Sequence, residues 1–312
     1  MNIAITGASG MLGTALINNI KKKFSVFATS RLKGLHQNNV IWSCFDLNNF
    51  TDLESWLHNV KPDVLIHCAA IVNVDECESN ADLAYHLHVK TTDFISNYCH
   101  QFNTHLIYIS TDSVFDGLKQ GSYTENDFTS PLNIYAQTKL LGETPVLSIE
   151  KGTVLRTNII GWSLKNRVSF SEWILLNSIK KQPIKLFKDV YFSPVHVEEL
   201  SEIIVQIIDR KIYGLFHISS NDYLSKYDFG LKLVKTFGLS SEYFKSSSIH
   251  EVELKAQRPK NISLCNDKIT SLLGIKLSNA ENAAKIMKKQ YINGYVAMIK
   301  NREITDEFKL WE

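Results

Sequence analysis

The chain has 312 residues, of which 44% are hydrophobic and 21% charged, and its formal net charge at pH 7 is +2. This length and composition are typical of a protein with a large buried core. The small net charge gives no indication of a nucleic-acid partner. No apolar run reaches the length of a membrane span, so no membrane partner is expected.

The cysteines and histidines indicate neither a disulfide framework nor a metal site. The cysteines form no CxxC pair, and the first apolar strand begins at residue 2, where a signal peptide would lie. This favours reduced, buried thiols in a cytoplasmic protein. The scattered histidines lack metal-ligand spacing, so no metal is expected. The five cysteines are Cys44, Cys68, Cys77, Cys99 and Cys265.

The amino-terminal segment predicts a nucleotide site. Residues 2–6 form an apolar run typical of a buried parallel strand, and residues 11–20 carry apolar side chains at helical spacing. Between them, Gly7 permits a tight turn, Gly10 lets the backbone approach a pyrophosphate, and Gly13 permits close helix–strand packing. The spacing is GxxGxxG, and an ordinary structural turn is the alternative. The expected cofactor-binding residues are Gly7, Ser9, Gly10, Met11, Leu12 and Gly13.

The end of the second strand indicates the type of cofactor. This strand is expected over residues 24–29, and Ser30, Arg31 and Lys33 follow it without an acidic residue. An acid here would bind a ribose 2′-hydroxyl, whereas cations favour a 2′-phosphate. The pattern therefore favours NADPH as the cofactor and allows NADH. A solvated basic loop is the alternative interpretation.

The third strand is expected to contact the adenine. It runs over residues 40–45 and is followed by Asp46 and Leu47. The carboxylate of Asp46 can accept a hydrogen bond from an adenine amine. The alternative is an N-cap for a helix over residues 51–59, although residues 49–50 lie closer to that start.

The fourth strand is expected to contact the nicotinamide ribose. It runs over residues 64–68 and ends at Cys68, which is followed by Ala69 and Ala70. Because these side chains are small, a ribose could lie directly against the backbone.

Strands and helices alternate through the first half of the chain. Helices are expected over residues 81–102 and 134–147, and strands over residues 104–109 and 152–157. This alternation predicts an α/β fold with a doubly wound parallel sheet of the Rossmann type. The less regular second half carries helical patterns over residues 170–181, 197–210, 225–237, 266–273 and 280–298, and strand patterns over residues 184–187 and 214–219.

The two halves are expected to differ in role. Residues 1–160 should form mainly a dinucleotide-binding domain. Residues 161–312 should form mainly a smaller substrate-binding lobe that is interleaved with it, because residues 214–219 are expected to return to the main sheet.

A hydroxyl, a phenol and an amine form a candidate catalytic group. Tyr135 and Lys139 are four residues apart and share one helix face, and Thr111 follows the preceding strand. A neighbouring ammonium and the positive nicotinamide ring would lower the pKa of Tyr135, which could then protonate the alkoxide formed by hydride addition. Thr111 would polarise the carbonyl, and Lys139 could also bind the nicotinamide ribose. A chance YxxxK pattern in a helix is the alternative.

These motifs belong to a longer pattern that covers about residues 1–275. The chain resembles the extended short-chain dehydrogenase/reductase superfamily and, within it, the dTDP-4-dehydrorhamnose reductase family. The resembling segments are residues 7–13, 67–70, 74–78, 110–117, Tyr123, Glu125, Pro131, residues 135–139, 142–143, 155–157, 192–194, 197–200 and 258–261.

The resemblance implies a nucleotide domain with a smaller carboxyl-terminal substrate lobe. It also implies reduction of a 4-keto group on a nucleotide-linked deoxysugar, and it allows a homodimer. Ser113 stands where the family usually has an aromatic residue, and Asn158-Ile159 where a Trp is frequent. Both positions face the sugar in the family. With Val74 and Thr111, they are the substrate-binding residues that the resemblance implies.

Arg258 precedes a proline in a segment that matches the family's substrate lobe. Its guanidinium could bind the diphosphate of the substrate, whereas a surface arginine is the alternative. The Asp-Glu pair that dehydratases of the superfamily carry after the Thr is missing, since Asp112 and Ser113 follow Thr111. The remaining alternatives are an epimerase and a non-catalytic regulatory subunit that resembles these reductases, like that of methionine adenosyltransferase.

Overall fold

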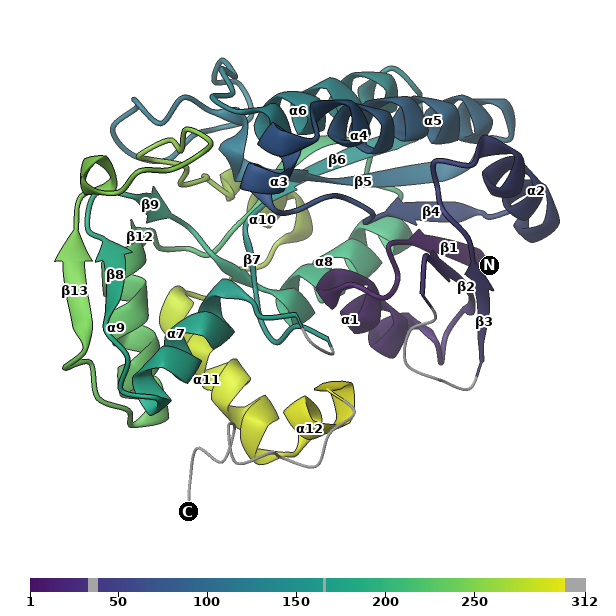
Figure 1. Cartoon of the computed structure of the whole chain (residues 1–312). Helices are drawn as coiled ribbons and strands as arrows, with labels where there is room; N and C mark the ends of the chain where they lie inside the picture. Colours follow the sequence, from purple (N-terminus) through teal and green to yellow (C-terminus); the bar gives the residue numbers. More distant parts are fainter. Residues whose placement is uncertain (33–38, 165–166, 301–312) are drawn as a thin grey trace.

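A parallel sheet of seven strands forms the centre of the computed structural model, which describes residues 1–32, 39–164 and 167–300 (Figure 1). The strand order is β11-β6-β5-β4-β1-β2-β3, and every neighbouring pair is parallel. The expected doubly wound α/β fold is therefore confirmed. The strands are β1 (Asn2–Thr6), β2 (Ser25–Ser30), β3 (Val40–Cys44), β4 (Val64–His67), β5 (His105–Thr111), β6 (Gly152–Thr157) and β11 (Gly214–Ile218).

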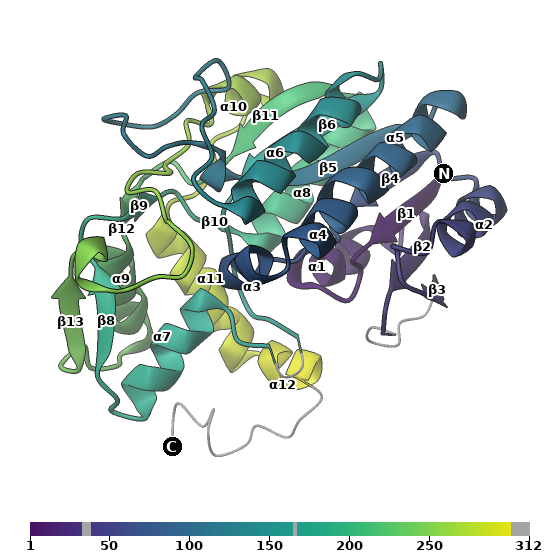
Figure 2. The ribbon, with the colours of Figure 1, turned by 45° about the horizontal axis from the view of Figure 1, so that its top comes forward.

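Helices cover both faces of the sheet because its central strands are buried on both sides. In Figure 1, α1 (Met11–Ile20) and α8 (Val197–Arg210) lie below the sheet and share one core with it. Figure 2 shows α5 (Thr91–Gln101) and α6 (Ile134–Leu147) across the opposite face. The helix α2 (Phe50–Val60) completes the core on that side.

The second half of the chain contributes to the main sheet and also forms a smaller lobe. The strand β11 pairs with β6 at one edge of the main sheet, and α10 (Asp267–Leu273) packs beside it. Most of the remaining elements form the smaller lobe around its own apolar core. These are α7 (Phe170–Ile179), α9 (Lys226–Phe237), α11 (Ala280–Ile292) and α12 (Tyr295–Lys300), with the strand pairs β8 (Ile184–Phe187) and β13 (Phe244–Ser247), and β9 (Tyr191–Phe192) and β12 (Leu224–Ser225).

Two expected helices are interrupted. The helix expected over residues 81–102 consists of α4 (Ala81–Tyr85), a π-helical turn over His86–Lys90, and α5. The helix expected over residues 280–298 divides into α11 and α12, because Gly294 takes a left-handed conformation with φ of +76°. A short helix, α3 (Val74–Ser79), was not predicted.

The start of α2 agrees with the position of residues 49–50 in the sequence. Asn49 caps this helix by accepting from the backbone N–H groups of Thr51 and Asp52, so Asp46 is not its cap.

All five cysteines are free thiols. Cys77 and Cys99 are buried as expected, and Cys68 and Cys265 are half-buried. Cys44 is exposed, so the expectation of burial is wrong for that residue.

The described residues show neither a membrane helix nor a metal cluster. Within residues 1–32, 39–164 and 167–300, no helix combines the length and apolar character needed to cross a bilayer. Over the same ranges, histidine, cysteine and carboxylate side chains form no group of three or more that could hold a metal ion.

Candidate active site

The glycine turn after β1 leaves no room for side chains at two of its positions. Gly7 has a φ of +63°, and a Cβ added there would lie 2.7 Å from Cα of Ala69. A Cβ on Gly13 would lie 2.6 Å from Cα of Ala8. Glycine is therefore required for the turn itself and for the close approach of α1 to it.

The first turn of α1 offers backbone donors to a ligand. Gly10 caps this helix in an extended conformation and provides no side-chain acceptor, so no capping side chain occupies the first N–H groups. The residues Leu12 and Gly13 are buried, whereas Ser9 and Met11 are half-buried. These features fit a pyrophosphate bound by backbone N–H groups at a helix N-terminus.

The ends of β2 and β3 lie at the edge of this site. The Ser30 hydroxyl donates to the Leu32 carbonyl oxygen at 2.5 Å, and the Arg31 side chain is exposed. Lys33 lies outside the described residues. Asp46 is exposed and accepts from the Asn48 backbone N–H, while Leu47 is buried in the core.

The end of β4 completes the expected cofactor surface. Cys68, Ala69 and Ala70 are half-buried, and Ala69 is the residue that the Gly7 turn approaches. Burial raises the pKa of Cys68 to about 12, so its side chain stays a neutral thiol.

Thr111 and Tyr135 meet at the carboxyl end of β5. Thr111 ends the strand, and Asn133 caps α6 by accepting from the Ala136 backbone N–H at 2.9 Å, which places Tyr135 in the first turn. The Thr111 hydroxyl, which donates to the Asp112 carboxylate at 3.1 Å, lies near enough to Tyr135 to affect its pKa. Burial raises the pKa of Tyr135 to about 12, against the opposing effect of Thr111. The phenol is therefore protonated at neutral pH.

Lys139 lies one turn further along α6 and points to the backbone of β5. Its ammonium donates to the Ile109 carbonyl oxygen at 2.7 Å and lies 3.9 Å from the ring centroid of Tyr108. Burial lowers the pKa of Lys139 to about 7, while the Glu143 carboxylate acts in the opposite direction.

The effect of Lys139 on the pKa of Tyr135 stays a prediction, because it was expected together with the charge of a bound nicotinamide ring. In the structure, burial is the main cause of the raised Tyr135 pKa, and Thr111, Asp112 and Cys77 have smaller effects. The Lys139 ammonium is directed to the Ile109 carbonyl oxygen.

His88 is a neighbour of the catalytic group that the sequence did not reveal. Its ring packs edge-on against Tyr135, with centroids 5.9 Å apart. Nε2 accepts from the Ile71 backbone N–H at 2.9 Å, so Nδ1 carries the proton and donates to the Thr138 hydroxyl at 2.8 Å. The π-helical turn that carries His88 leaves no clear sequence signal.

A buried ion pair holds α6 against the sheet. Arg156 on β6 donates to the Glu143 carboxylate at 2.7 Å, and Ser110 donates to the same group at 2.5 Å. The Arg156 and Glu143 side chains are 5% and 3% exposed, so the pair is screened from solvent. It fixes the position of the helix that carries Tyr135 and Lys139 relative to β5.

Ser113 and Asn158 converge on one buried carboxylate. The Asp112 side chain accepts from the hydroxyls of Thr111 and Ser113 at 3.1 and 3.2 Å, and from the Asn158 amide at 2.7 Å. Burial raises the pKa of Asp112 despite these bonds. The two positions implied to face the sugar are therefore linked to Thr111 through Asp112. Val74 lies apart from them, at the first residue of α3.

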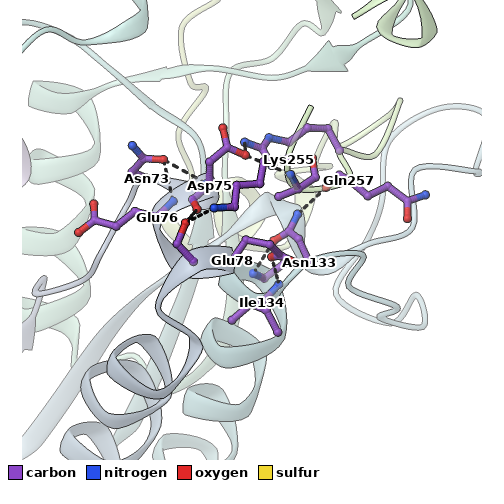
Figure 3. A network of polar contacts seen from close by, with 12 residues as sticks. Asn73, Asp75, Glu76, Glu78, Asn133, Ile134, Lys255 and Gln257 are labelled. Atoms are coloured by element: carbon purple, nitrogen blue, oxygen red, sulfur yellow. Dashed lines mark hydrogen bonds and ion pairs between the residues drawn. The ribbon is translucent and has the colours of Figure 1, made fainter. Parts of the chain in front are cut away.

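Arg258 belongs to a loop that docks on α3 and on the start of α6. Its guanidinium donates to the Asp75 carboxylate at 3.0 Å. Figure 3 shows the contacts around this pair, in which Asn133 donates to the Gln257 carbonyl oxygen at 2.8 Å. Lys255 contacts Ser79 at 2.5 Å. Arg258 therefore already has an anionic partner, and a substrate diphosphate would share or replace it.

Solved structures share the fold of this chain over most of their length. A dTDP-4-dehydrorhamnose reductase from Clostridium acetobutylicum is 27% identical, with a TM-score of 0.82, and the match covers 93% of this chain and 99% of that one. A dTDP-4-dehydrorhamnose reductase from Bacillus anthracis, solved in complex with NADP, has a TM-score of 0.83 at 24% identity, with the same coverage. The fold and the Thr–Tyr–Lys arrangement define a protein of the extended short-chain dehydrogenase/reductase superfamily.

The chain belongs to the RmlD substrate binding domain family, whose model matches residues 1–292. A curated relative, methionine adenosyltransferase 2 subunit beta from Rattus norvegicus, is 30% identical over 286 residues. That match covers 86% of this chain and 82% of the relative.

Proposed function

We propose that this protein is an NADPH-dependent reductase of a 4-keto group on a nucleotide-linked deoxysugar, with Tyr135 as proton donor. The observation that supports this most directly is the meeting of Thr111, Tyr135 and Lys139 at the carboxyl end of β5, where the Lys139 ammonium donates to the Ile109 carbonyl oxygen at 2.7 Å. In an open parallel sheet, ligands bind at that end of the strands. The similarity to the reductase from Clostridium acetobutylicum supports the substrate class.

The residues around the glycine turn and the end of β2 are proposed to bind the cofactor. The Gly7–Gly13 turn binds the pyrophosphate, Ser30 and Arg31 bind the 2′-phosphate, and NADPH, when bound, supplies the hydride. The NADP in the relative from Bacillus anthracis supports this choice of cofactor. Lys33, Asp46 and Leu47 remain proposed cofactor contacts.

Thr111 and Tyr135 act on the carbonyl oxygen. Thr111 donates a hydrogen bond where negative charge develops, and Tyr135 transfers its proton to the alkoxide. A pKa of about 12 keeps the Tyr135 proton in place at neutral pH until the substrate has gained negative charge. Lys139 binds the ribose and contributes a positive charge near the reacting groups.

The substrate is proposed to lie between the main sheet and the smaller lobe. Val74, Ser113 and Asn158 would contact the sugar, and Arg258 would contact the diphosphate beside Asp75. The test is to mix the protein with NADPH and a panel of nucleotide-linked 4-ketosugars and to follow the loss of absorbance from NADPH. Oxidation that depends on one ketosugar is expected, and no oxidation with any of them would contradict the proposal.

The 30% identity to methionine adenosyltransferase 2 subunit beta favours a second candidate, a subunit of a methionine adenosyltransferase without turnover of its own. This candidate predicts NADPH binding without oxidation by any ketosugar. It also predicts a change in the activity of a methionine adenosyltransferase when the two proteins are mixed. The two measurements together distinguish the candidates.

A further inference from the structure

Lys226 holds an ammonium group without a polar partner at the start of α9. Its Nζ lies 3.4 Å from the ring centroid of Phe192 and 4.8 Å from that of Phe170. Among the described residues, no side-chain hydrogen bond or ion pair involves this ammonium, and the side chain is half-buried. Ring faces attract a cation but do not satisfy its N–H donors.

The segment beneath this ammonium adjoins the polar group next to Thr111, because Phe192 is followed by Val195, whose backbone N–H donates to the Asn158 carbonyl oxygen at 2.9 Å. Lys226 is close enough to Asp112 for each charge to shift the pKa of the other, and burial lowers the pKa of Lys226 to about 8. The Asp112 oxygens already accept from Thr111, Ser113 and Asn158. The donors of Lys226 therefore remain available beside the residue that would contact the reacting carbonyl.

We propose that Lys226 is a substrate-binding residue whose ammonium donates to an oxygen substituent of the sugar ring, close to the reacting carbonyl. This inference rests on the proposed function and assigns a specificity-determining contact within it. The hydroxyl of Ser113 and one amide N–H of Asn158 already donate to Asp112, so Lys226 provides further donors beside them on this side of the sugar.

Charge explains why the ligand is a sugar oxygen and not the diphosphate. The Asp112 carboxylate offsets the positive charge of Lys226, so the surroundings of the ammonium have little net charge. A diphosphate here would also be repelled by the buried Asp112 carboxylate, whereas a neutral hydroxyl oxygen would not. A sugar oxygen would at the same time satisfy donors that are costly to leave unpaired in a half-buried place.

The test compares ligands with and without a sugar on the full chain saturated with NADPH. Calorimetric titrations with dTDP-glucose and UDP-glucose, which carry no ketone, are set beside titrations with dTDP and UDP. Lys226→Met keeps an apolar chain against the two phenylalanine rings and removes the N–H donors together with their positive charge. We expect it to weaken binding of the better nucleotide-sugar about tenfold or more and to leave the free diphosphate unchanged.

Control variants distinguish the loss of a substrate contact from a loss of folding. Lys226→Arg keeps the charge and should retain most of the affinity, and thermal unfolding of each variant reports whether the fold survives. If the Met variant does not fold, Lys226→Gln replaces it, with the same expected selective loss. The inference would be overturned if the Met variant and the unmodified protein bound the nucleotide-sugar with equal affinity. It would also be overturned if the Met variant lost as much affinity for the free diphosphate as for the nucleotide-sugar. If the unmodified protein binds neither nucleotide-sugar, the proposed function fails together with this assignment.

Discussion

His88 and Thr138 are joined by a 2.8 Å hydrogen bond from Nδ1 to the hydroxyl, which ties the π-helical turn to the catalytic helix. The Thr138 hydroxyl in turn donates to the Ile134 carbonyl oxygen at 2.8 Å. Burial lowers the pKa of His88 to about 2, so the imidazole is neutral and keeps one donor and one acceptor. The neutral ring can therefore satisfy the Ile71 N–H and the Thr138 hydroxyl at once.

His88→Ala should lower the free energy of unfolding by about 1–3 kcal/mol, because it leaves the half-buried Ile71 N–H without its acceptor and removes the hydrogen bond to Thr138. It should also lower kcat, since the ring no longer packs against Tyr135. Thr138→Val is the matched control, because it breaks the hydrogen bond between His88 and Thr138 but keeps the ring and its bond to Ile71. Urea unfolding and steady-state kinetics measure both effects. Equal effects of the two variants on kcat would show that ring packing contributes nothing.

Tyr135→Phe should lower kcat by about 100-fold or more, because it removes the proton donor and keeps the ring. The affinity for NADPH should stay nearly unchanged. Steady-state kinetics with the best ketosugar of the panel and a fluorescence titration with NADPH measure the two quantities. Turnover close to normal in this variant would exclude Tyr135 as the acid.

Lys139→Met should change the pH dependence of stability as well as lower turnover. The pKa of Lys139 falls from 10.5 to about 7 on folding, so between these values the unfolded chain holds a proton that the folded chain has released. Wild-type stability therefore gains a contribution as pH rises through this range, and the Met variant lacks it. Relative to wild type, the variant should be most stable at about pH 6.5 and should lose this advantage by about pH 9.5. Urea unfolding without cofactor measures the difference, and a constant difference would show that Lys139 keeps its ordinary pKa.

Arg31→Ala should weaken the binding of NADPH more than the binding of NADH, because only NADPH carries the 2′-phosphate. A hydrogen bond to a charged group contributes about 1.5–3 kcal/mol, which corresponds to roughly tenfold or more in affinity. Lys23→Ala, which removes a surface cation paired with Asp209, is the control for a general change in charge. Equal losses for the two cofactors would mean that Arg31 does not contact the 2′-phosphate.

Arg258→Ala should raise KM for the ketosugar about tenfold and spare NADPH binding, if the guanidinium reaches the diphosphate. Asp75→Asn separates this role from loop docking, because it removes the charge that competes for Arg258. The Asn variant should then bind the substrate at least as well as wild type. A rise in KM of equal size in both variants would assign Arg258 to docking of its loop alone.

Local patterns predicted most of the sheet, and long-range contacts account for what was missed. The strands and the glycine turn follow from apolar runs and glycine spacing, which are properties of neighbouring residues. The partnership of Arg258 with Asp75 spans 183 positions, so no local pattern could reveal it. The same holds for His88, which contacts α6 from an irregular turn, and for Lys226, which packs on the rings of Phe170 and Phe192.

The return of β11 to the main sheet has a consequence for anyone who wishes to produce the two halves separately. Without β11, the strand β6 would become an open edge of the sheet. Its unpaired N–H and C=O groups could then form hydrogen bonds with another molecule. Loss of α8 would uncover the apolar face of α1 and of the strands beneath it. A fragment ending near residue 160 should therefore aggregate. A shorter protein with an intact nucleotide site would need residues 195–218 to be joined back to it.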